Sequence, residues 1–441
     1  MQDYETPLLK GTVLASIGTL LAACQQPTPV PPTAAPEPTK AAEQPAAPPE
    51  PTAAPRQEPV TITYAFWDQS LQPYINDSLA AFNKMEPNIQ VELQVIPWNE
   101  YWPKLQSAAA GGQVADVLWM DVPYYNIYAK NGVLMKLDPL IERDGLDMSM
   151  YPVNSYDGLA DGMYVLPSWF DVMGLWYNKK IFDQAGVAYP SPDWTWDDLK
   201  AAAKQIKQNT GVYGFASVID GYQGWWNFVA QNGGKLHTPD GATFTFDDAA
   251  GCEAIDFYTS FIREGLSPDG PTLASATDTG SLFTGGQVAM MIFGGWMFKT
   301  VHEACPDCAV TALPKGKVAT SYTHTMSNAM WSGTKHPEEA WKFLKFLGSK
   351  EGLSIIASTG SSVPDYKGLE NDWINSIPGI GLEEVYSQVG HQTSWPPGTM
   401  EYFDGMNSAF QDAYNGNIPW DQLCKEATRL ANEARAKAAE Q

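Results

Sequence analysis

An alternation of strand-like and helix-like segments constrains the fold of this chain most. Residues 60–66 and 89–95 alternate apolar and polar side chains, as half-buried strands do, and residues 116–120 form a short apolar run. The segments between them, 71–84 and 99–110, have the pattern of helices. Successive strand–helix–strand units predict a parallel sheet with helices on both faces, and ligands bind such sheets at the carboxyl ends of the strands.

Later segments repeat this pattern. Residues 194–199 supply an N-cap and an acidic first turn for a helix through Gln208, and residues 246–249 open a helix that runs to Glu264. Residues 288–293 are typical of a buried strand, and Pro337 suits the first position of a helix over 338–347. The last helix, 420–438, is expected to dock on the surface.

The N-terminal region has the order of parts found in exported proteins. Residues 11–23 are apolar or small, too few to span a bilayer, and end at Leu21-Ala22-Ala23-Cys24, which resembles the lipobox of bacterial lipoproteins. Residues 1–10 depart from a signal peptide because they carry two acids and one cation. We expect a signal peptide over 1–23 and a lipidated Cys24, the alternative being an ordinary disordered N-terminus with a chance cysteine.

Residues 24–58 are expected to form a disordered tether. The segment after Cys24 is rich in Pro, Ala, Thr, Gln and Glu, and it has too few apolar side chains to offset the entropy of ordering. Its prolines favour extended structure, so it predicts a semi-rigid spacer. This organisation places the globular part on the extracytoplasmic face of a cell membrane, held by a lipid anchor on Cys24.

Composition limits the partners. The formal net charge is −23, which disfavours nucleic acids, anionic membrane surfaces and polyanionic ligands. The five histidines are scattered and no ligand spacing indicates a metal, so neither a metal nor another cofactor is predicted. The 16 Trp and 20 Tyr exceed what a core needs, which favours an aromatic binding surface.

Six segments, in order and spacing, are similar to one known family. They are residues 115–124, 158–167, 176–186, 194–199, 289–296 and 335–347. They resemble the extracellular solute-binding proteins of ATP-driven (ABC) importers, in particular the carbohydrate-binding group that includes maltodextrin binders. The resemblance implies a two-lobed α/β fold of the type II periplasmic-binding-protein kind, each lobe a mainly parallel sheet flanked by helices, with a cleft and a hinge between. It places lobe one at 59–168 plus 309–348 and lobe two at 169–308 plus 349–441.

A sugar site pairs aromatic platforms with carboxylates and amides, because sugars present apolar faces and hydroxyl rims. Trp67, Asp68 and Asp121 follow predicted strands, and the resemblance assigns Trp296 to the position of an aromatic that stacks on the sugar. A core tryptophan and a helix-capping aspartate are the alternatives at these positions. The complete predicted ligand-binding set is Trp67, Asp68, Asp121, Tyr124, Trp169, Asp171, Trp225, Trp226, Gly295, Trp296, Asn328, Trp395 and Tyr402.

Several members of this set rest on weaker grounds. The resemblance places Trp169 and Asp171 where the chain crosses between lobes, and Trp395 and Tyr402 where the family often supplies another aromatic. Adjacent tryptophans point in different directions, so at most one of Trp225 and Trp226 is expected to face a ligand. Asn328 suits either a hydrogen bond to the ligand or a turn.

The cysteines predict a local disulfide. Outside the cytoplasm, Cys305 and Cys308 in a Cys-x-x-Cys segment favour a bond to each other. A redox motif is the alternative, but it requires the first cysteine at a helix start, whereas residues 309–313 look like a strand. Cys252 and Cys424 both fall in predicted helices, and their spacing leaves open whether they pair.

These features predict a monomeric, non-catalytic protein that captures a mono- or oligosaccharide between its lobes and delivers it to a membrane permease. A secreted glycoside hydrolase is one alternative, since an acidic, aromatic cleft also suits two-carboxylate chemistry, but the resemblance offers no acid–base pair. A solute-sensing lipoprotein on the same fold is the other. The sequence favours a neutral sugar without identifying it, and polyols remain open.

Overall fold

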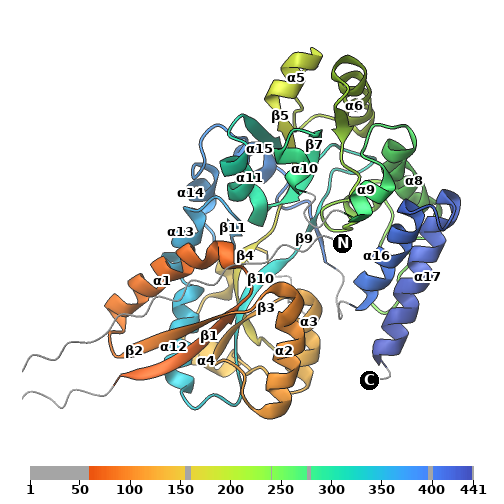
Figure 1. Cartoon of the computed structure of the whole chain (residues 1–441). Helices are drawn as coiled ribbons and strands as arrows, with labels where there is room; N and C mark the ends of the chain where they lie inside the picture. The colour runs from red at the N-terminus through yellow and green to blue at the C-terminus, as the bar shows by residue number, and fades with distance from the viewer. Residues whose placement is uncertain (1–58, 154–159, 240, 276–279, 396–400, 440–441) are drawn as a thin grey trace, which may run out of the picture. The chain divides into compact units, whose positions relative to one another are not determined.

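The fold was analysed in a computed structural model, which describes residues 59–153, 160–239, 241–275, 280–395 and 401–439 (Figure 1). The predicted signal peptide, Cys24 and the tether lie outside the described residues. All elements below belong to one compact unit, Gln57–Gln441. Within the described part of the chain, we find no helix whose length and apolar character would let it cross a bilayer.

A six-stranded sheet forms the first half of the fold, with strand order β11-β4-β10-β3-β1-β2. Its strands are β1 (Val60–Phe66), β2 (Ile89–Val95), β3 (Val117–Met120), β4 (Val165–Phe170), β10 (Thr325–Met330) and β11 (Val363–Pro364). β1 lies parallel to β2, in register from Val60–Ile89 to Phe66–Val95, and parallel to β3 on its other side. The predicted strand–helix order over residues 60–120 is therefore confirmed.

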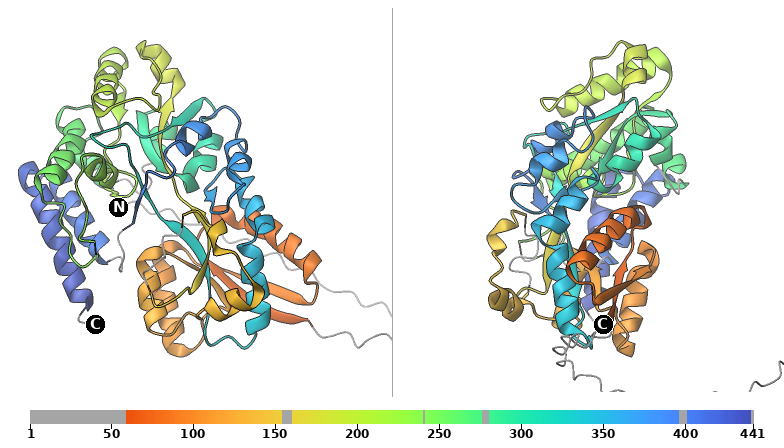
Figure 2. Two further views of the ribbon diagram at one scale, coloured as in Figure 1. Left: turned by 180° about the vertical axis from the view of Figure 1, so that it is seen from behind. Right: turned by 90° about the vertical axis from the view of Figure 1, so that its left-hand side faces the viewer.

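Helices from distant parts of the sequence cover this sheet. They are α1 (Gln72–Met85), α2 (Trp98–Gly111), α3 (Val122–Lys130), α4 (Asp138–Asp144), α12 (Pro337–Leu347) and α13 (Lys350–Ala357), with the short 3-10 helices η1 (Gln69–Leu71) and η2 (Met148–Met150). α1 packs against α12 and α13, and Figure 2 shows the cyan α12 beside the orange elements of the sheet. α12 begins at Pro337, with His336 as its N-cap, so Pro337 lies at the first helical position as predicted.

A four-stranded sheet forms the second half, with order β6-β7-β5-β8. Its strands are β5 (Met173–Asn178), β6 (Tyr213–Phe215), β7 (Val288–Gly294) and β8 (Cys308–Thr311). A separate pair joins β9 (Tyr322–Thr323) to β12 (Thr393–Ser394) in parallel. β7 is buried along its whole length, as its apolar sequence predicts.

Many helices pack around the second sheet. They are α5 (Lys179–Ala185), α6 (Trp196–Thr210), α7 (Trp225–Gln231), α8 (Ala249–Arg263), α9 (Gly270–Ser275), α10 (Gly280–Thr284), α11 (Phe298–Ala304), α14 (Glu370–Ile374), α15 (Leu382–Tyr386), α16 (Glu401–Tyr414) and α17 (Trp420–Ala439), with the 3-10 helix η3 (Gly295–Met297). α6 starts with a capping box, in which Thr195 and Asp198 satisfy each other's backbone N–H groups. The N-cap predicted within 194–199 is thus present, and the helix predicted to open at 246–249 begins after its N-cap Asp248.

The prediction of mainly parallel sheets is wrong in detail, because both sheets are mixed. β10 runs antiparallel to β3 and β4, and β5 runs antiparallel to β7 and β8. The cause lies in the crossings: β4 leads directly into β5 of the other sheet, and the chain returns through β9 and β10. A strand that brings the chain back enters its sheet in the opposite direction, which the local sequence pattern does not show.

Each sheet has its own hydrophobic core, so the fold has two lobes. The first-lobe core draws on residues 62–169 and 326–369, and the second-lobe core draws chiefly on 170–322 and 373–431. The predicted boundaries at 309 and 349 therefore need correction. Residues 309–311 belong to β8, which pairs with β5 of the second lobe. Beyond 349, α13 packs on α1, and β11 pairs with β4 of the first lobe.

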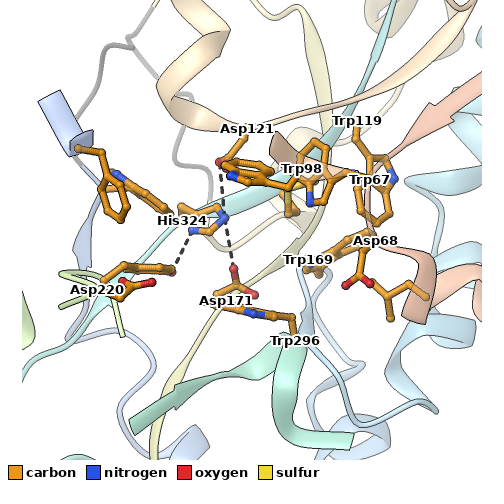
Figure 3. Close-up of a pocket in the computed structure, with 15 residues that line it drawn as sticks. Trp67, Asp68, Trp98, Trp119, Asp121, Trp169, Asp171, Asp220, Trp296 and His324 are labelled. Carbon is orange, nitrogen blue, oxygen red and sulfur yellow. Dashed lines mark hydrogen bonds and ion pairs between the residues drawn. The ribbon is translucent and has the colours of Figure 1, made fainter. Parts of the chain in front are cut away.

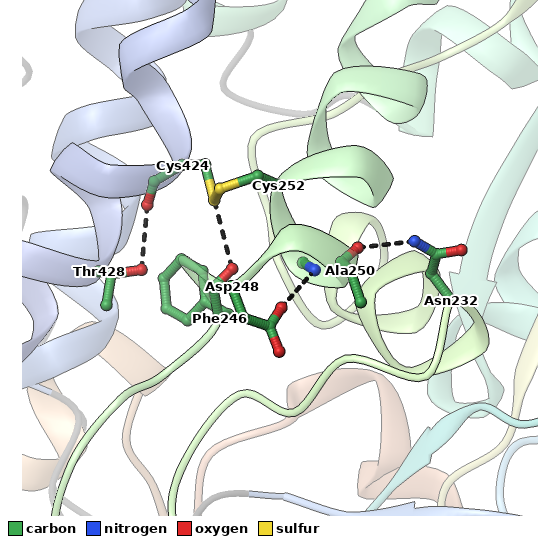
Figure 4. The surroundings of a disulfide bond; sticks show 8 residues. Asn232, Phe246, Asp248, Ala250, Cys252, Cys424 and Thr428 are labelled. Atoms are coloured by element: carbon green, nitrogen blue, oxygen red, sulfur yellow. Dashed lines mark hydrogen bonds between the residues drawn. A yellow bond between two sulfur atoms is a disulfide. The ribbon is translucent and has the colours of Figure 1, made fainter.

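Two disulfides lie in the second lobe. One joins Cys252 of α8 to Cys424 of α17 and so ties the C-terminal helix to the lobe (Figure 4). The other joins Cys305, at the end of α11, to Cys308, the first residue of β8. Since Cys305 ends a helix instead of starting one, the redox alternative lacks the helix N-terminus that would activate its thiol.

Candidate ligand-binding cavity

A cavity of about 420 Å³ lies where residues of the two lobes meet (Figure 3). Its volume falls in the range of small-molecule sites. Aromatic side chains and aspartates dominate its wall. The lining residues are Trp67, Asp68, Leu71, Trp98, Trp119, Asp121, Trp169, Asp171, Asp220, Tyr222, Trp296, His324, Met326, Trp395 and Phe403.

The first lobe contributes side chains that follow its parallel strands. Asp68 comes after β1 and caps η1, its Oδ1 accepting hydrogen bonds from the Ser70 backbone N–H and hydroxyl at 2.8 and 2.6 Å. Asp121 comes after β3 and caps α3, its Oδ1 accepting from the Val122 N–H at 2.7 Å. Because both caps use Oδ1, Oδ2 of each carboxylate lies outside the cap. The capping and binding interpretations of these residues are therefore compatible.

The crossing segments hold a buried aspartate against a neighbouring strand. Asp171 follows β4; its N–H donates to the His324 carbonyl at 3.1 Å, and its own carbonyl accepts from the Thr323 hydroxyl at 2.6 Å. Its side-chain Oδ1 accepts from the Ser362 hydroxyl at 3.0 Å. These bonds fix the carboxylate of Asp171 at the point where the chain passes between the lobes.

His324 connects this aspartate to both lobes. Its Nε2 lies 3.2 Å from Asp171 Oδ2 and 3.5 Å from Asp121 Oδ1, and its Nδ1 lies 2.9 Å from the Tyr222 hydroxyl (Figure 3). His324 is 5% exposed, Asp121 2% and Asp171 3%. The cluster thus joins a first-lobe residue, a crossing residue and a second-lobe residue.

Burial governs the protonation of this cluster. Loss of solvation raises the pKa of Asp121 to about 7 and that of Asp171 to about 8, because it disfavours the charged carboxylates. The same effect lowers the pKa of His324 to about 3, so the imidazole is neutral at physiological pH. Burial also raises the pKa of Asp220, which lines the cavity from the second lobe.

Aromatic rings form two groups in the wall. In the first lobe, Trp67 makes edge contacts with Trp98 and Trp119, with ring centroids 5.0 and 4.9 Å apart. In the second, Trp296 is stacked with Tyr222 at 5.7 Å and 13°, and Tyr222 also contacts Trp395 at 4.3 Å. Rings from both lobes can therefore cover an apolar ligand face, while the carboxylates accept hydrogen bonds from its rim.

Sequence comparison identifies the family. The sequence model described as "Bacterial extracellular solute-binding protein" matches residues 67–353, more than half of the chain. The chain belongs to this family.

Individual relatives agree over most of the chain. A Brucella abortus (strain 2308) protein whose name describes a binding protein is 26% identical over 386 residues, covering 85% of this chain and 92% of the relative. The galactooligosaccharide-binding protein of Bacillus subtilis (strain 168) is 24% identical over 372 residues, 81% of this chain and 85% of that one. Among solved structures, an ABC substrate-binding protein from Listeria monocytogenes in complex with cycloalternan gives a TM-score of 0.77 at 26% identity, covering 85% of this chain and 99% of that one.

The structure of this solute-binding protein brings part of the predicted set together at the cavity. The members that line it are Trp67, Asp68, Asp121, Trp169, Asp171, Trp296 and Trp395. They follow strands, lie at crossings or come from the C-terminal segment, which are the placements on which their prediction was based.

Of three other predicted residues, two lie in the second-lobe core and one packs against the first-lobe core. Trp225 is fully buried in α7, stacked on Phe410, and its Nε1 donates to the Ile219 carbonyl. Trp226 is also fully buried. Tyr124 stacks face to face on Trp102 of α2, with centroids 3.5 Å apart. Neither Trp225 nor Trp226 lines the cavity, so their inclusion in the predicted ligand-binding set is wrong.

Three others have structural partners near the site. Asn328 accepts from the Tyr64 hydroxyl at 2.7 Å and donates to Ser168 at 2.7 Å within the first sheet. Gly295 is buried, with its N–H bonded to the Val172 carbonyl. The Tyr402 hydroxyl accepts from Nε1 of Trp395 at 3.0 Å, so Tyr402 supports a lining residue from behind.

Sequence reasoning missed eight lining residues: Leu71, Trp98, Trp119, Asp220, Tyr222, His324, Met326 and Phe403. Tyr222 lies in the glycine-flanked turn just before Trp225, and Trp119 lies in β3 just before Asp121. The sequence pattern pointed to Trp225 and Asp121 and not to these two neighbours. No local pattern marks His324, whose role depends on contacts with Asp171 and Tyr222 far away in the sequence. Within the described part of the chain, no group of three or more His, Cys, Asp or Glu side chains is arranged to hold a metal.

Proposed function

We propose that this protein is the substrate-binding component of an ATP-driven importer and that it binds a sugar in the cavity between its lobes. The observation that carries the proposal is a cavity of about 420 Å³ whose tryptophans and aspartates come from both lobes. The similar proteins support the ligand class: one is named for binding galactooligosaccharides, and another was solved with cycloalternan.

The cavity suits sugar chemistry. Trp67 and Trp98 of the first lobe and Trp296 of the second offer apolar ring faces. Asp68 and Asp121 keep carboxylate oxygens that can accept hydrogen bonds from sugar hydroxyls. A ligand that touches both walls stabilises the closed arrangement of the lobes, because it gains contacts there that an open arrangement cannot offer. We propose the seven predicted residues that line the cavity, together with Tyr222 and His324, as its binding residues.

The remaining parts of the proposal concern location and partners. Membership of an extracellular family indicates that the globular part works outside the cytoplasm. We propose that Cys24 carries a lipid anchor, that residues after it tether the lobes to the membrane, and that a permease receives the sugar. The protein is proposed to act as a monomer and without catalysis.

A thermal-shift screen over mono- and oligosaccharides tests the proposal. A ligand that binds only the native protein stabilises it by RT ln(1 + [L]/Kd), about 2.7 kcal/mol at a hundredfold excess over Kd. We expect a saturable shift with at least one sugar, and isothermal titration should give one site per chain. Absence of any shift across the panel would contradict the proposal. Release of smaller sugars from a bound oligosaccharide would instead favour a glycoside hydrolase.

A further inference from the structure

The charge of the cavity wall is one-sided. Four of its lining residues are aspartates, Asp68, Asp121, Asp171 and Asp220, and none of the described lining residues is Lys or Arg. The one basic side chain, His324, is buried and faces two of the carboxylates. A ligand that enters this cavity therefore meets several carboxyl groups, and no lining Lys or Arg is present to balance their charge when they ionise.

Part of the donor capacity of the wall is already used within the protein. Several donors of the wall already bond to protein groups: Nε1 of Trp119 donates to Tyr64 at 2.6 Å, and Nε1 of Trp395 donates to Tyr402. The Tyr222 hydroxyl is paired with Nδ1 of His324. A neutral sugar needs donors for its ring and hydroxyl oxygens as well as acceptors, whereas an ammonium group has three donors and needs only acceptors.

The aromatic rings favour the same ligand chemistry. Trp67, Trp98, Trp296 and Tyr222 line the cavity. Aromatic faces attract an organic cation through their quadrupoles, most strongly where water is excluded. Carboxylates and aromatic faces together thus stabilise a positive group more than a neutral hydroxyl in its place.

We infer that the sugar bound here carries a protonated amine, which pairs with the carboxylates of Asp171 and Asp121 under the aromatic rings. The inference rests on the proposed sugar-binding function and narrows its ligand class. Both carboxylates lie within 3.5 Å of the same nitrogen, Nε2 of His324, so they approach one point from the crossing segment and from the first lobe. A cation beside them restores the ionised form that burial disfavours in the empty cavity.

The test compares ligands that differ only in the amine. Purified protein is titrated with matched pairs: glucosamine and glucose, galactosamine and galactose, and the β-1,4-linked disaccharides of glucosamine and of glucose. In the pairs that bind, we expect the amino sugar to bind about tenfold or more tightly, since hydrogen bonds to charged groups are the stronger ones. Added salt should weaken the amino sugar more than its neutral partner.

Two variants test whether Asp171 and Asp121 cause the preference for the amino sugar. Asp171→Asn and Asp121→Asn should each reduce the ratio of amino to neutral affinity at least threefold. Asp197→Asn is the matched control, because it removes one negative charge from an exposed position in the first turn of α6. The control should leave the ratio unchanged. Neutral-sugar affinity of each variant reports whether its cavity is still formed.

Each outcome decides a different claim. Equal or tighter binding of the neutral members would overturn the amine inference while leaving the sugar-binding function standing. A preference for amines that persists in both cavity variants would overturn the assignment to Asp171 and Asp121. No binding by any sugar of the panel would overturn the proposed function itself, and the inference with it.

Discussion

Replacing Trp296 with alanine should remove most of the affinity for sugar while leaving the protein folded. Trp296 lines the cavity just after β7 and is stacked with Tyr222, with ring centroids 5.7 Å apart. It is partly exposed, in contrast to the fully buried tryptophans of the same lobe. Its side chain is therefore available to a ligand, while its buried part packs against the second-lobe core.

The magnitude follows from buried area. A sugar ring stacked on the indole removes roughly 100 Å² of apolar surface from water over both partners, which at about 25 cal/mol per Å² gives about 2.5 kcal/mol. That energy corresponds to about a 60-fold increase in Kd. Because Trp296 is mostly buried and packs against the second-lobe core, its removal should lower the free energy of unfolding of the empty protein by about 3 kcal/mol.

Isothermal titration measures the first quantity, and urea unfolding without ligand measures the second. Trp194→Ala is the matched control, because Trp194 is a partly buried tryptophan of the second lobe that packs against Phe182, outside the cavity. The control should lose similar stability with unchanged Kd. Sugar affinity that is unchanged in Trp296→Ala, or lowered equally in both variants, would refute the reasoning.

Two further predictions concern stability. Burial raises the pKa of Asp171 from 3.8 to about 8, so its carboxyl group binds a proton more tightly in the native protein than in the unfolded chain. The free energy of unfolding that this proton contributes is fully present below about pH 4 and is lost as pH rises through 8. The ligand-free wild type should therefore lose several kcal/mol relative to Asp171→Asn between pH 5 and 9 in urea unfolding, whereas a pH-independent difference would contradict this. The Cys252–Cys424 disulfide spans 172 residues and the Cys305–Cys308 disulfide spans 3, so chain entropy predicts losses of about 5 and 2 kcal/mol when each pair is changed to serine. Equal losses at the same protein concentration would show that loop length does not control these contributions.

Local periodicity was sufficient to predict the elements of the first lobe from β1 to β3. The alternation in residues 60–66 and 89–95 identified β1 and β2, and the glycines after residue 110 ended α2 within a residue of its observed end. These features depend on neighbours in the sequence. The antiparallel placement of β10 beside β3 depends on a segment some two hundred residues away, which no local pattern encodes.

The cavity residues also divide into those that the local sequence predicts and those that depend on distant segments. Trp67, Asp68 and Asp121 could be predicted because residues after parallel strands gather at one edge of a sheet. Trp225 looked similar in sequence, but tryptophan suits both a core and a ligand surface, and only packing against Phe410 decides between them. His324 was missed because its function depends on where two crossing segments meet.

The central claim, that a sugar lies between the two lobes, is tested most directly by a crystal structure of the protein with the sugar that ranks first in the thermal-shift screen. We expect electron density for one sugar in the cavity, with a ring on Trp296 and a polar group within 3.5 Å of the Asp171 or Asp121 carboxylate. Density for the sugar at another surface, with this cavity empty at saturating ligand, would contradict the account.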